Sequence, residues 1–154
     1  MFITKLISLV FIFIVFFYSK LFAFSAEDFS KAKNYLKCRN CDLTDANFSK
    51  LMLQGIDLEQ SNLTGANFSN ADLSIAKKEK FDLPSNLTRV NLKNANFSNA
   101  NLSGVNFEGA YLKNVNFSGA NLTNANLKDA SLKGANFEEA KFINGEILLF
   151  IFKI

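Results

Sequence analysis

The sequence contains no histidine and no tryptophan, and it has one proline and two cysteines in 154 residues. The absence of histidine removes the side chain that most often serves as a general base or a metal ligand near neutral pH. No constellation among the other residues looks like an active site. We therefore expect a protein that is not an enzyme and that holds no metal or other cofactor.

An excess of charge of one sign is also missing. The chain has 17 basic and 14 acidic residues, and two of the basic ones, Lys5 and Lys20, precede Ala23 in a stretch that contains no acid. The remainder thus has 15 basic against 14 acidic residues, a net charge of about +1. This predicts neither a basic stripe that would bind nucleic acid nor an acidic surface that would imitate it.

An apolar residue recurs at every fifth position, and a small residue lies two places before each one. A helix returns to one face every 3.6 residues and a strand every two, so a period of five fits neither. If the small and the large residue both point inward, the others turn a corner, which Asn, Asp and Gly favour. The unbroken series is Leu92, Phe97, Leu102, Phe107, Leu112, Phe117, Leu122, Leu127, Leu132, Phe137 and Phe142.

Units such as residues 95–99 (ANFSN) and 120–124 (ANLTN) resemble those of pentapeptide repeat proteins, and the resemblance covers about two thirds of the chain. It implies an all-β fold, a right-handed quadrilateral β-helix in which four pentapeptides form one square coil. Stacked coils bury an apolar face that one repeat cannot bury alone. We expect residues 43–145 to form one solenoid of about five coils.

The series has one break, where a lysine cluster places Lys78 at an inward position. Burying that charge would cost several kcal/mol, so we expect residues 75–86 to bulge outward and leave Lys78 in water. Irregularities are where we expect a repeat protein to bind a partner. Candidate interaction positions here are Lys77, Lys78 and Lys80.

The spacing at the break also predicts a register. Leu83 lies ten residues after Leu73, but Leu87 follows after only four, so we interpret the break as the loss of one residue around Pro84. In that register the inward residues form four columns, and one of them ends in a stack of phenylalanine rings. The columns contain Leu53, Leu73, Leu92, Leu112 and Leu132; Leu43, Leu63, Leu83, Leu102, Leu122 and Phe142; Phe48, Phe68, Leu87, Phe107 and Leu127; and Leu58, Lys78, Phe97, Phe117 and Phe137.

Residues 1–25 have the features of a secretory signal peptide. Lys5 precedes thirteen residues without a charge, and small residues follow near Ala23. The alternative is an uncleaved anchor, which would contact the membrane. Both interpretations predict export to the periplasm or cell envelope.

Residues 26–42 are expected to close the first coil. Phe29, Ala32 and Leu36 have helical spacing and Ser25 can serve as N-cap, which predicts a short amphipathic capping helix. The alternative is a helix that binds a partner. A capping helix would protect the edge of the first coil, which could otherwise pair with another chain.

Cys38 and Cys41 follow this helix as a CxxC pair. With no histidine and no second cysteine pair, zinc lacks ligands. In an oxidising compartment the pair predicts a local disulfide between the cap and the first coil. Free buried thiols and redox catalysis remain as alternatives.

The last segment, residues 146–154, is apolar and far too short to span a membrane as a helix. It can cover the last coil, join two copies into a homodimer, or touch lipid. Its candidate interaction positions are Ile147, Leu149, Phe150 and Phe152.

These features together predict a non-catalytic structural or protein-interaction module, exported to the periplasm or cell envelope, with a protein partner that the sequence does not identify. The resemblance also implies an alternative, because some members of that family protect DNA gyrase as DNA mimics. The export signal and the near-neutral charge count against it. A thiol or redox protein that uses Cys38 and Cys41 is the other alternative.

Overall fold

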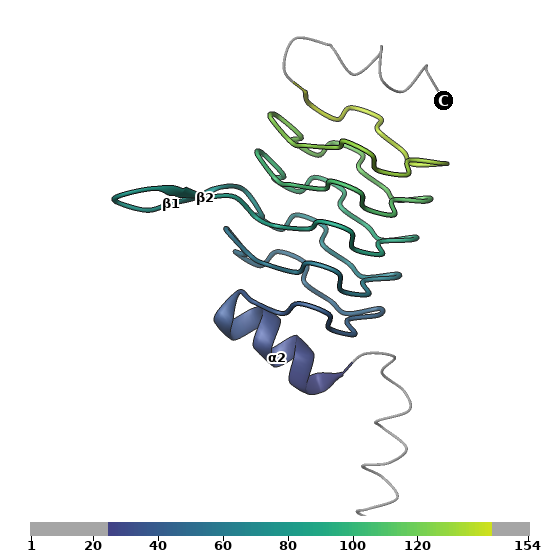
Figure 1. Cartoon of the computed structure of the whole chain (residues 1–154). Coiled ribbons are helices and arrows are strands. Elements are labelled where there is room, and N and C mark those ends of the chain that lie inside the picture. The colour runs from purple at the N-terminus through teal and green to yellow at the C-terminus, as the bar shows by residue number, and fades with distance from the viewer. Residues whose placement is uncertain (1–24, 143–154) are drawn as a thin grey trace, which may run out of the picture.

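The structure is a computed structural model, and it describes residues 25–142. Helix α2 (Ala26–Tyr35) lies at one end of a stack of coils, and strands β1 (Ala76–Lys77) and β2 (Asp82–Leu83) form a hairpin that projects sideways from the stack (Figure 1). The predicted signal segment and apolar tail lie outside the described residues. Within residues 25–142, no helix combines the length and the hydropathy that a membrane crossing needs.

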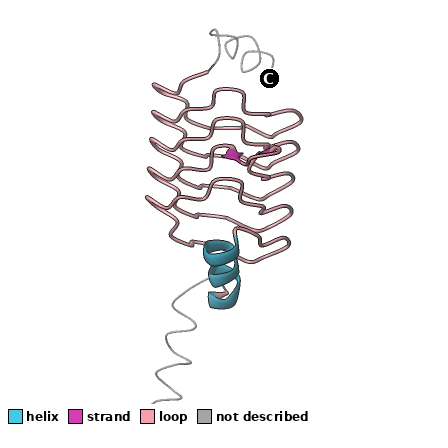
Figure 2. Ribbon diagram, turned by 90° about the vertical axis from the view of Figure 1, so that its left-hand side faces the viewer, coloured by secondary structure: helices cyan, strands magenta, loops and turns pink. Residues whose placement is uncertain are grey.

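The coils are held together by parallel bridges between residues that lie twenty apart, such as Asp42 with Asn62 and Asn101 with Asn121. Twenty residues are four pentapeptides, so each coil has four units. Each unit contributes a single bridging residue before the chain turns, which explains why the coils contain almost no extended strands (Figure 2). One column of bridges shows five stacked coils within the described residues: Lys37, Asp57, Asn86, Asn106 and Asn126.

The core is a narrow column of inward-facing residues along the shaft. In the inner coils the large apolar side chains are 0 to 1% exposed. The predicted ring stack is present and extends further towards the N-terminus than expected, because Phe48, Phe68 and Phe97 stack with centroids 4.8 and 4.7 Å apart. Phe117 and Phe137 continue it at 5.5 and 5.1 Å. Offset aromatic pairs at these separations add to the stability gained by burial.

The predicted register across the break is wrong. Bridges join Asp57 to Asn86 and Asn67 to Asn96, and these partners lie nine places further apart in the sequence than the partners of the regular coils. Relative to a regular coil of twenty residues, the chain therefore contains nine additional residues here and has not lost one. The shaft resumes at Ser85. The gained residues, 76–84, form the hairpin and the return to the shaft.

This insertion changes the columns. In the core columns, Leu92 stacks next to Leu63 and Leu102 stacks next to Leu73. The backbone shows this, because the amides of Leu63 and Leu73 donate to the carbonyls of Asn91 and Asn101 in the next coil. Leu83, expected in the core, is 41% exposed on the hairpin. The position of Leu83 matches the five-residue period only because of the length of the hairpin, and not because its side chain lies in the core. The structure has these columns: Leu43, Leu63, Leu92, Leu112 and Leu132; Phe48, Phe68, Phe97, Phe117 and Phe137; Leu53, Leu73, Leu102, Leu122 and Phe142; and Leu58, Leu87, Phe107 and Leu127.

Helix α2 covers the first coil. Its N-cap is Ser25, whose hydroxyl accepts a hydrogen bond from the amide of Asp28 at 3.2 Å, and it ends at the left-handed residue Leu36. The ring of Phe29 lies 5.0 Å from that of Phe48, so the helix begins the aromatic stack. The first coil is consequently as well buried as those above it.

Candidate functional site

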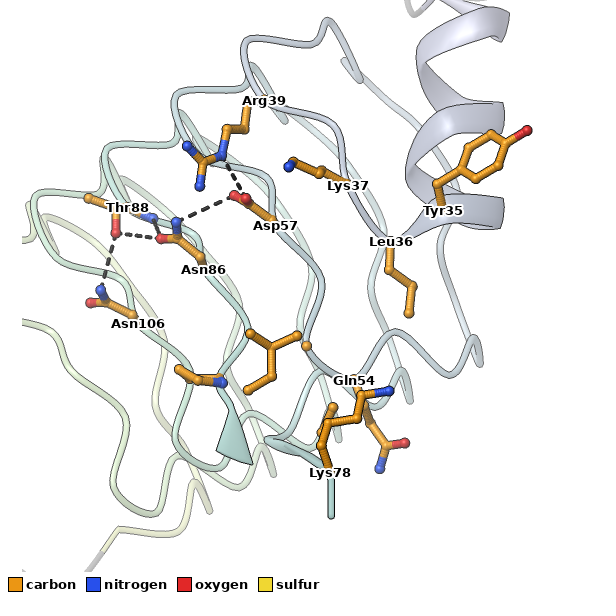
Figure 3. Close-up of a pocket in the computed structure, with 14 residues that line it drawn as sticks. Tyr35, Leu36, Lys37, Arg39, Gln54, Asp57, Lys78, Asn86, Thr88 and Asn106 are labelled. Atoms are coloured by element: carbon orange, nitrogen blue, oxygen red, sulfur yellow. Dashed lines mark hydrogen bonds and ion pairs between the residues drawn. The ribbon is translucent and has the colours of Figure 1, made fainter. Parts of the chain in front are cut away.

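A groove with a volume of about 640 Å³ lies where the hairpin leaves the shaft. The end of α2 and the first coil form one wall, the base of the hairpin forms the other, and residues of successive coils form the floor (Figure 3). We call it the hairpin groove. It is lined by Tyr35, Leu36, Lys37, Arg39, Gln54, Gly55, Asp57, Ala76, Lys78, Leu83, Pro84, Asn86, Thr88 and Asn106.

The hairpin is short and tightly closed. Ala76 pairs with Leu83 and Lys77 with Asp82 in antiparallel register, and the amide of Lys78 donates to the carbonyl of Phe81 at 3.2 Å. The side chains of Lys77 and Asp82 also form an ion pair at 2.6 Å. This pair is exposed to water, so the backbone pairing rather than the charge defines the hairpin.

Two glycines make room for the base of the hairpin. Ile75 lies between Gly55 and Gly104 in one corner column of the shaft, and both glycines have positive φ, +73° and +69°. A Cβ at Gly104 would overlap the side chain of Ile75, and one at Gly55 would lie 2.9 Å from the Cβ of Ala76. Because neither glycine has a side chain, the hairpin can pack closely against the coils below and above it.

The polar floor of the groove is a connected network. Arg39 donates from Nε to Asp57 at 2.6 Å, and its Nη1 lies 3.2 Å from Glu59. The hydrogen bond to Asp57, and then the charge of Asp57, raise the pKa of Arg39 above its usual value. Asn86 donates to the second oxygen of Asp57 at 3.4 Å. These groups are oriented by one another, so the floor is preformed.

The rim of the groove combines apolar and cationic side chains. Leu83 is 41% exposed and Tyr35 is 77% exposed, and the Tyr35 ring points away from the other labelled residues in Figure 3. Lys37 and Lys78 belong to none of the ion pairs found among residues 25–142. An apolar wall with unpaired positive charge suits a ligand that is apolar and acidic.

The predicted lysine positions all lie on the hairpin, but they differ in their surroundings. Lys77 is paired with Asp82, Lys78 lines the groove, and Lys80 is exposed at the turn beside Phe81, which is 63% exposed. Lys78 lies in water, as the cost of burying a charge required. The four predicted tail positions lie outside the described residues.

Cys38 and Cys41 lie close to Arg39 in the sequence, but neither cysteine lines the groove. Their Cα atoms are 5.6 Å apart, the geometry is that of a disulfide, and both side chains are buried. The Asp28 carboxylate is also within 4.8 Å of both sulfur atoms. The two cysteines thus lie at disulfide distance just after the capping helix.

Sequence reasoning missed Arg39, Asp57 and Leu83 as parts of one site. Arg39 and Asp57 lie in different coils, and only the coil register shows that they are neighbours. Leu83 was assigned to the core because it matched the repeat. Gly55 and Gly104 pack against the base of the hairpin, but other repeats have glycine at the same turn position, so these two do not locate the hairpin from the sequence.

The repeats match the family model for pentapeptide repeats over residues 41–76, 85–124 and 110–145, with eight copies. The gap between the first two matched segments is the hairpin. No curated protein sequence matches the chain.

Solved structures of pentapeptide repeat proteins are also similar to it. One, from the thylakoid lumen of Arabidopsis thaliana, is 27% identical with a TM-score of 0.61, over 77% of both chains. HetL from Nostoc, described as involved in the regulation of heterocyst differentiation, is 26% identical with a TM-score of 0.60 over 71% of this chain, which spans 48% of HetL. QnrB1, a plasmid-mediated fluoroquinolone resistance protein, is 24% identical with a TM-score of 0.38, over 73% of this chain and 65% of its own. The chain belongs to the pentapeptide repeat family, whose members form right-handed β-helices.

Proposed function

We propose that this protein is a non-catalytic interaction module of the periplasm or cell envelope, and that it binds a protein partner through the hairpin groove and the exposed end of the hairpin. The observation that carries this proposal is the nine-residue insertion, which places Phe81 and Leu83 in water. The aromatic stack of the shaft continues past the insertion without these residues. Exposed apolar side chains gathered beside a cleft are typical of interaction sites.

The chemistry of the groove supports binding rather than catalysis. Its carboxylate, Asp57, accepts hydrogen bonds from Arg39 and Asn86, so both of its oxygens are occupied within the floor of the groove. The unpaired cations Lys37 and Lys78 favour a partner segment that presents acidic and apolar side chains. Such charges would steer the partner and fix its orientation more than they would add affinity.

Export rests on the sequence of residues 1–25 and is supported by the paired cysteines. Disulfides persist in oxidising compartments and are rare in the cytosol. We propose that Cys38 and Cys41 form a disulfide that fixes the capping helix to the first coil. Both sulfur atoms are buried, which counts against a redox role, because exchange requires an accessible thiolate.

Cell fractionation with N-terminal sequencing tests the location. We expect a product that begins between residues 24 and 26 in the periplasmic fraction, or an intact chain in the membrane fraction if the segment serves as an anchor. An intact chain in the cytosol would contradict export.

Site-specific photo-crosslinking in living cells tests the binding surface. We would place a benzophenone amino acid at Phe81, with Tyr111 on the shaft as a matched control because it is also aromatic and 41% exposed. The proposal predicts one defined cross-linked partner from Phe81 and none from Tyr111. Lys78→Glu should weaken the cross-link, whereas Lys93→Glu on the shaft should not. Identical products from both positions, or none from Phe81, would contradict the proposal.

A further inference from the structure

Three lysines lie one above another on one outer face of the shaft, in its third, fourth and fifth coils. Each comes two places after a residue that bridges neighbouring coils, and these bridging residues form one column. The amide of Asn94 donates to the carbonyl of Lys113 at 3.0 Å, and that of Asn114 donates to the next lysine at 2.9 Å, so the register is continuous. The near-neutral composition predicted no basic stripe, but the coil register forms a short one. We call it the lysine column: Lys93, Lys113 and Lys133.

The lysine column has no counter-charge on its own face. Its three units, residues 90–94, 110–114 and 130–134, contain no acid. Among the described residues, none of the three lysines belongs to an ion pair. The corner before this face adds one cation, Arg89, and one acid, Asp129, which cancel. Like charges that face each other on neighbouring strands are destabilising, so folding of the shaft gives no reason for this arrangement.

The same face departs from the repeat at two bridging positions. In most units an Asn or Asp there accepts a hydrogen bond from the amide two places later, as Asn91 does from Lys93 at 3.2 Å. Tyr111 and Ser131 occupy this position in the next two coils, and the amides of the two upper lysines have no acceptor in the described part of the chain. The five other units between residues 105 and 139 keep the bond. Both exceptions therefore lie beside the lysine column, where they replace a residue that stabilises the turn.

The two exceptions present groups that suit a sugar. The Tyr111 side chain is 41% exposed, and neither its hydroxyl nor that of Ser131 forms a hydrogen bond with the described residues. An exposed phenol ring offers an apolar surface on which the less polar face of a sugar ring can pack. Both hydroxyls can donate to and accept from the hydroxyls of a sugar. Together with the lysines, they favour a ligand that carries both hydroxyls and negative charge.

The arrangement favours a linear polymer over other anionic ligands. The lysines step along the shaft at about 4.8 Å, the spacing of neighbouring strands, and so mark a line about 10 Å long. An acidic polysaccharide carries carboxylates at regular intervals and can follow this line. Single-stranded nucleic acid is bound through aromatic rings for successive bases, but Tyr111 is the only aromatic residue in the three units. Membrane contact relies on large exposed apolar side chains, and this face has none besides Tyr111.

We propose that the lysine column and Tyr111 bind a linear acidic polysaccharide that runs along the shaft. Its carboxylates pair with the lysines, and one of its sugar rings packs on Tyr111. No residue of the three units lines the hairpin groove, so this surface is separate from the one proposed for a protein partner and does not depend on it. Because the ligand is not a protein, Tyr111 remains a valid control for cross-linking to a protein.

Calorimetric titration with oligogalacturonate, a linear oligomer of galacturonic acid, tests the proposal on the protein expressed from Met1. Low salt, about 20 mM, keeps the charges weakly screened. One exposed ion pair changes an affinity by up to about fivefold, so Gln at all three positions of the lysine column should weaken binding by about tenfold or more. A control with Lys33→Gln, Lys50→Gln and Lys141→Gln removes as much charge from other surfaces and should bind normally. No binding by the unaltered protein, or equal affinities in the two triple variants, would overturn the proposal.

Substitutions at Tyr111 test the contact with the sugar ring. Tyr111→Asn restores the residue that the repeat favours, so the turn bond can form and we expect the variant to fold. Its binding to oligogalacturonate should be about fivefold weaker or more, the lower end of what stacking on an aromatic ring contributes. Tyr111→Phe keeps the ring and should retain most of the affinity. Unchanged binding by the Asn variant would refute this contact.

Three further probes test the class of ligand. Neutral maltose oligomers should not bind, because they carry no charge for the lysines. Single-stranded oligothymidylate and vesicles of phosphatidylglycerol should bind more weakly than oligogalacturonate. Stronger binding by either of these, lost in the triple variant of the lysine column, would assign the surface to nucleic acid or lipid and would overturn the proposal. Equal binding of the neutral oligomers would overturn it as well.

Discussion

Phe68 stacks on Phe97 with ring centroids 4.7 Å apart and ring planes 3° from parallel, although the whole hairpin lies between them in the sequence. Phe48 and Phe68, which are separated by one regular coil of four pentapeptides, stack in the same way at 4.8 Å. The core therefore continues across the insertion, and the hairpin is an addition to the outside of the shaft. This separation of shaft from hairpin leaves the hairpin available for the binding role that we propose for it.

Phenylalanine substitutions should distinguish the shaft from the hairpin. Phe97→Ala removes a fully buried ring from the middle of the stack, and we expect the free energy of unfolding to fall by about 3 to 5 kcal/mol. Phe81→Ala removes an exposed ring, and its effect should stay within about 0.5 kcal/mol. Urea unfolding measures both, and similar losses would contradict this division.

Gly104→Ala should destabilise the protein by about 1 to 3 kcal/mol, because it combines a positive φ with an overlap against Ile75. Gly109→Ala is the control, since its φ is also positive but its nearest neighbour is the flexible side chain of Arg89. Thermal unfolding should show a larger loss at Gly104. Adding Ile75→Ala should make the effect of Gly104→Ala smaller. If the two glycine variants are equally stable, the packing of the hairpin base is not as described.

Ser85→Ala should stabilise the protein by about 1 kcal/mol. The Ser85 hydroxyl is fully buried and has no hydrogen-bond partner among the described residues, and a methyl group at that place would avoid the cost. Ser61→Ala is the opposite case, because its hydroxyl donates to the carbonyl of Cys38 at 2.6 Å and accepts from the amide of Cys41 at 3.1 Å. Calorimetry should give changes of opposite sign, and a loss at both positions would refute the assignment.

Replacing Cys38 and Cys41 together with Ser should lower the free energy of unfolding by about 2 kcal/mol, the amount expected for so short a loop. A reductant should lower the stability of the unaltered protein by a similar amount and leave the double variant unchanged. Cross-linking from Phe81 should persist in the double variant. Loss of that cross-link in a folded double variant would favour the redox alternative.

Much of the shaft could be predicted from the sequence, because each inward Leu or Phe is set by a local rule that repeats every five residues. The hairpin could not, because Leu83 fits the same rule by coincidence while its side chain lies outside. The groove could be predicted least, since the pairing of Arg39 with Asp57 depends on how many residues form a coil. Gly55 and Gly104 lie where the base of the hairpin packs, but glycine is so common in turns that neither residue reveals a neighbour such as Ile75.

The central claim is that nine residues are inserted into an otherwise continuous shaft, and NOEs between inward side chains test it most directly. We expect contacts between the rings of Phe68 and Phe97, and between the methyl groups of Leu63 and Leu92, whose backbones are joined through the carbonyl of Asn91. Contacts between Leu63 and Leu83, with none between Leu63 and Leu92, would contradict the claim, because they would place Leu83 in the core and leave no hairpin to bind a partner.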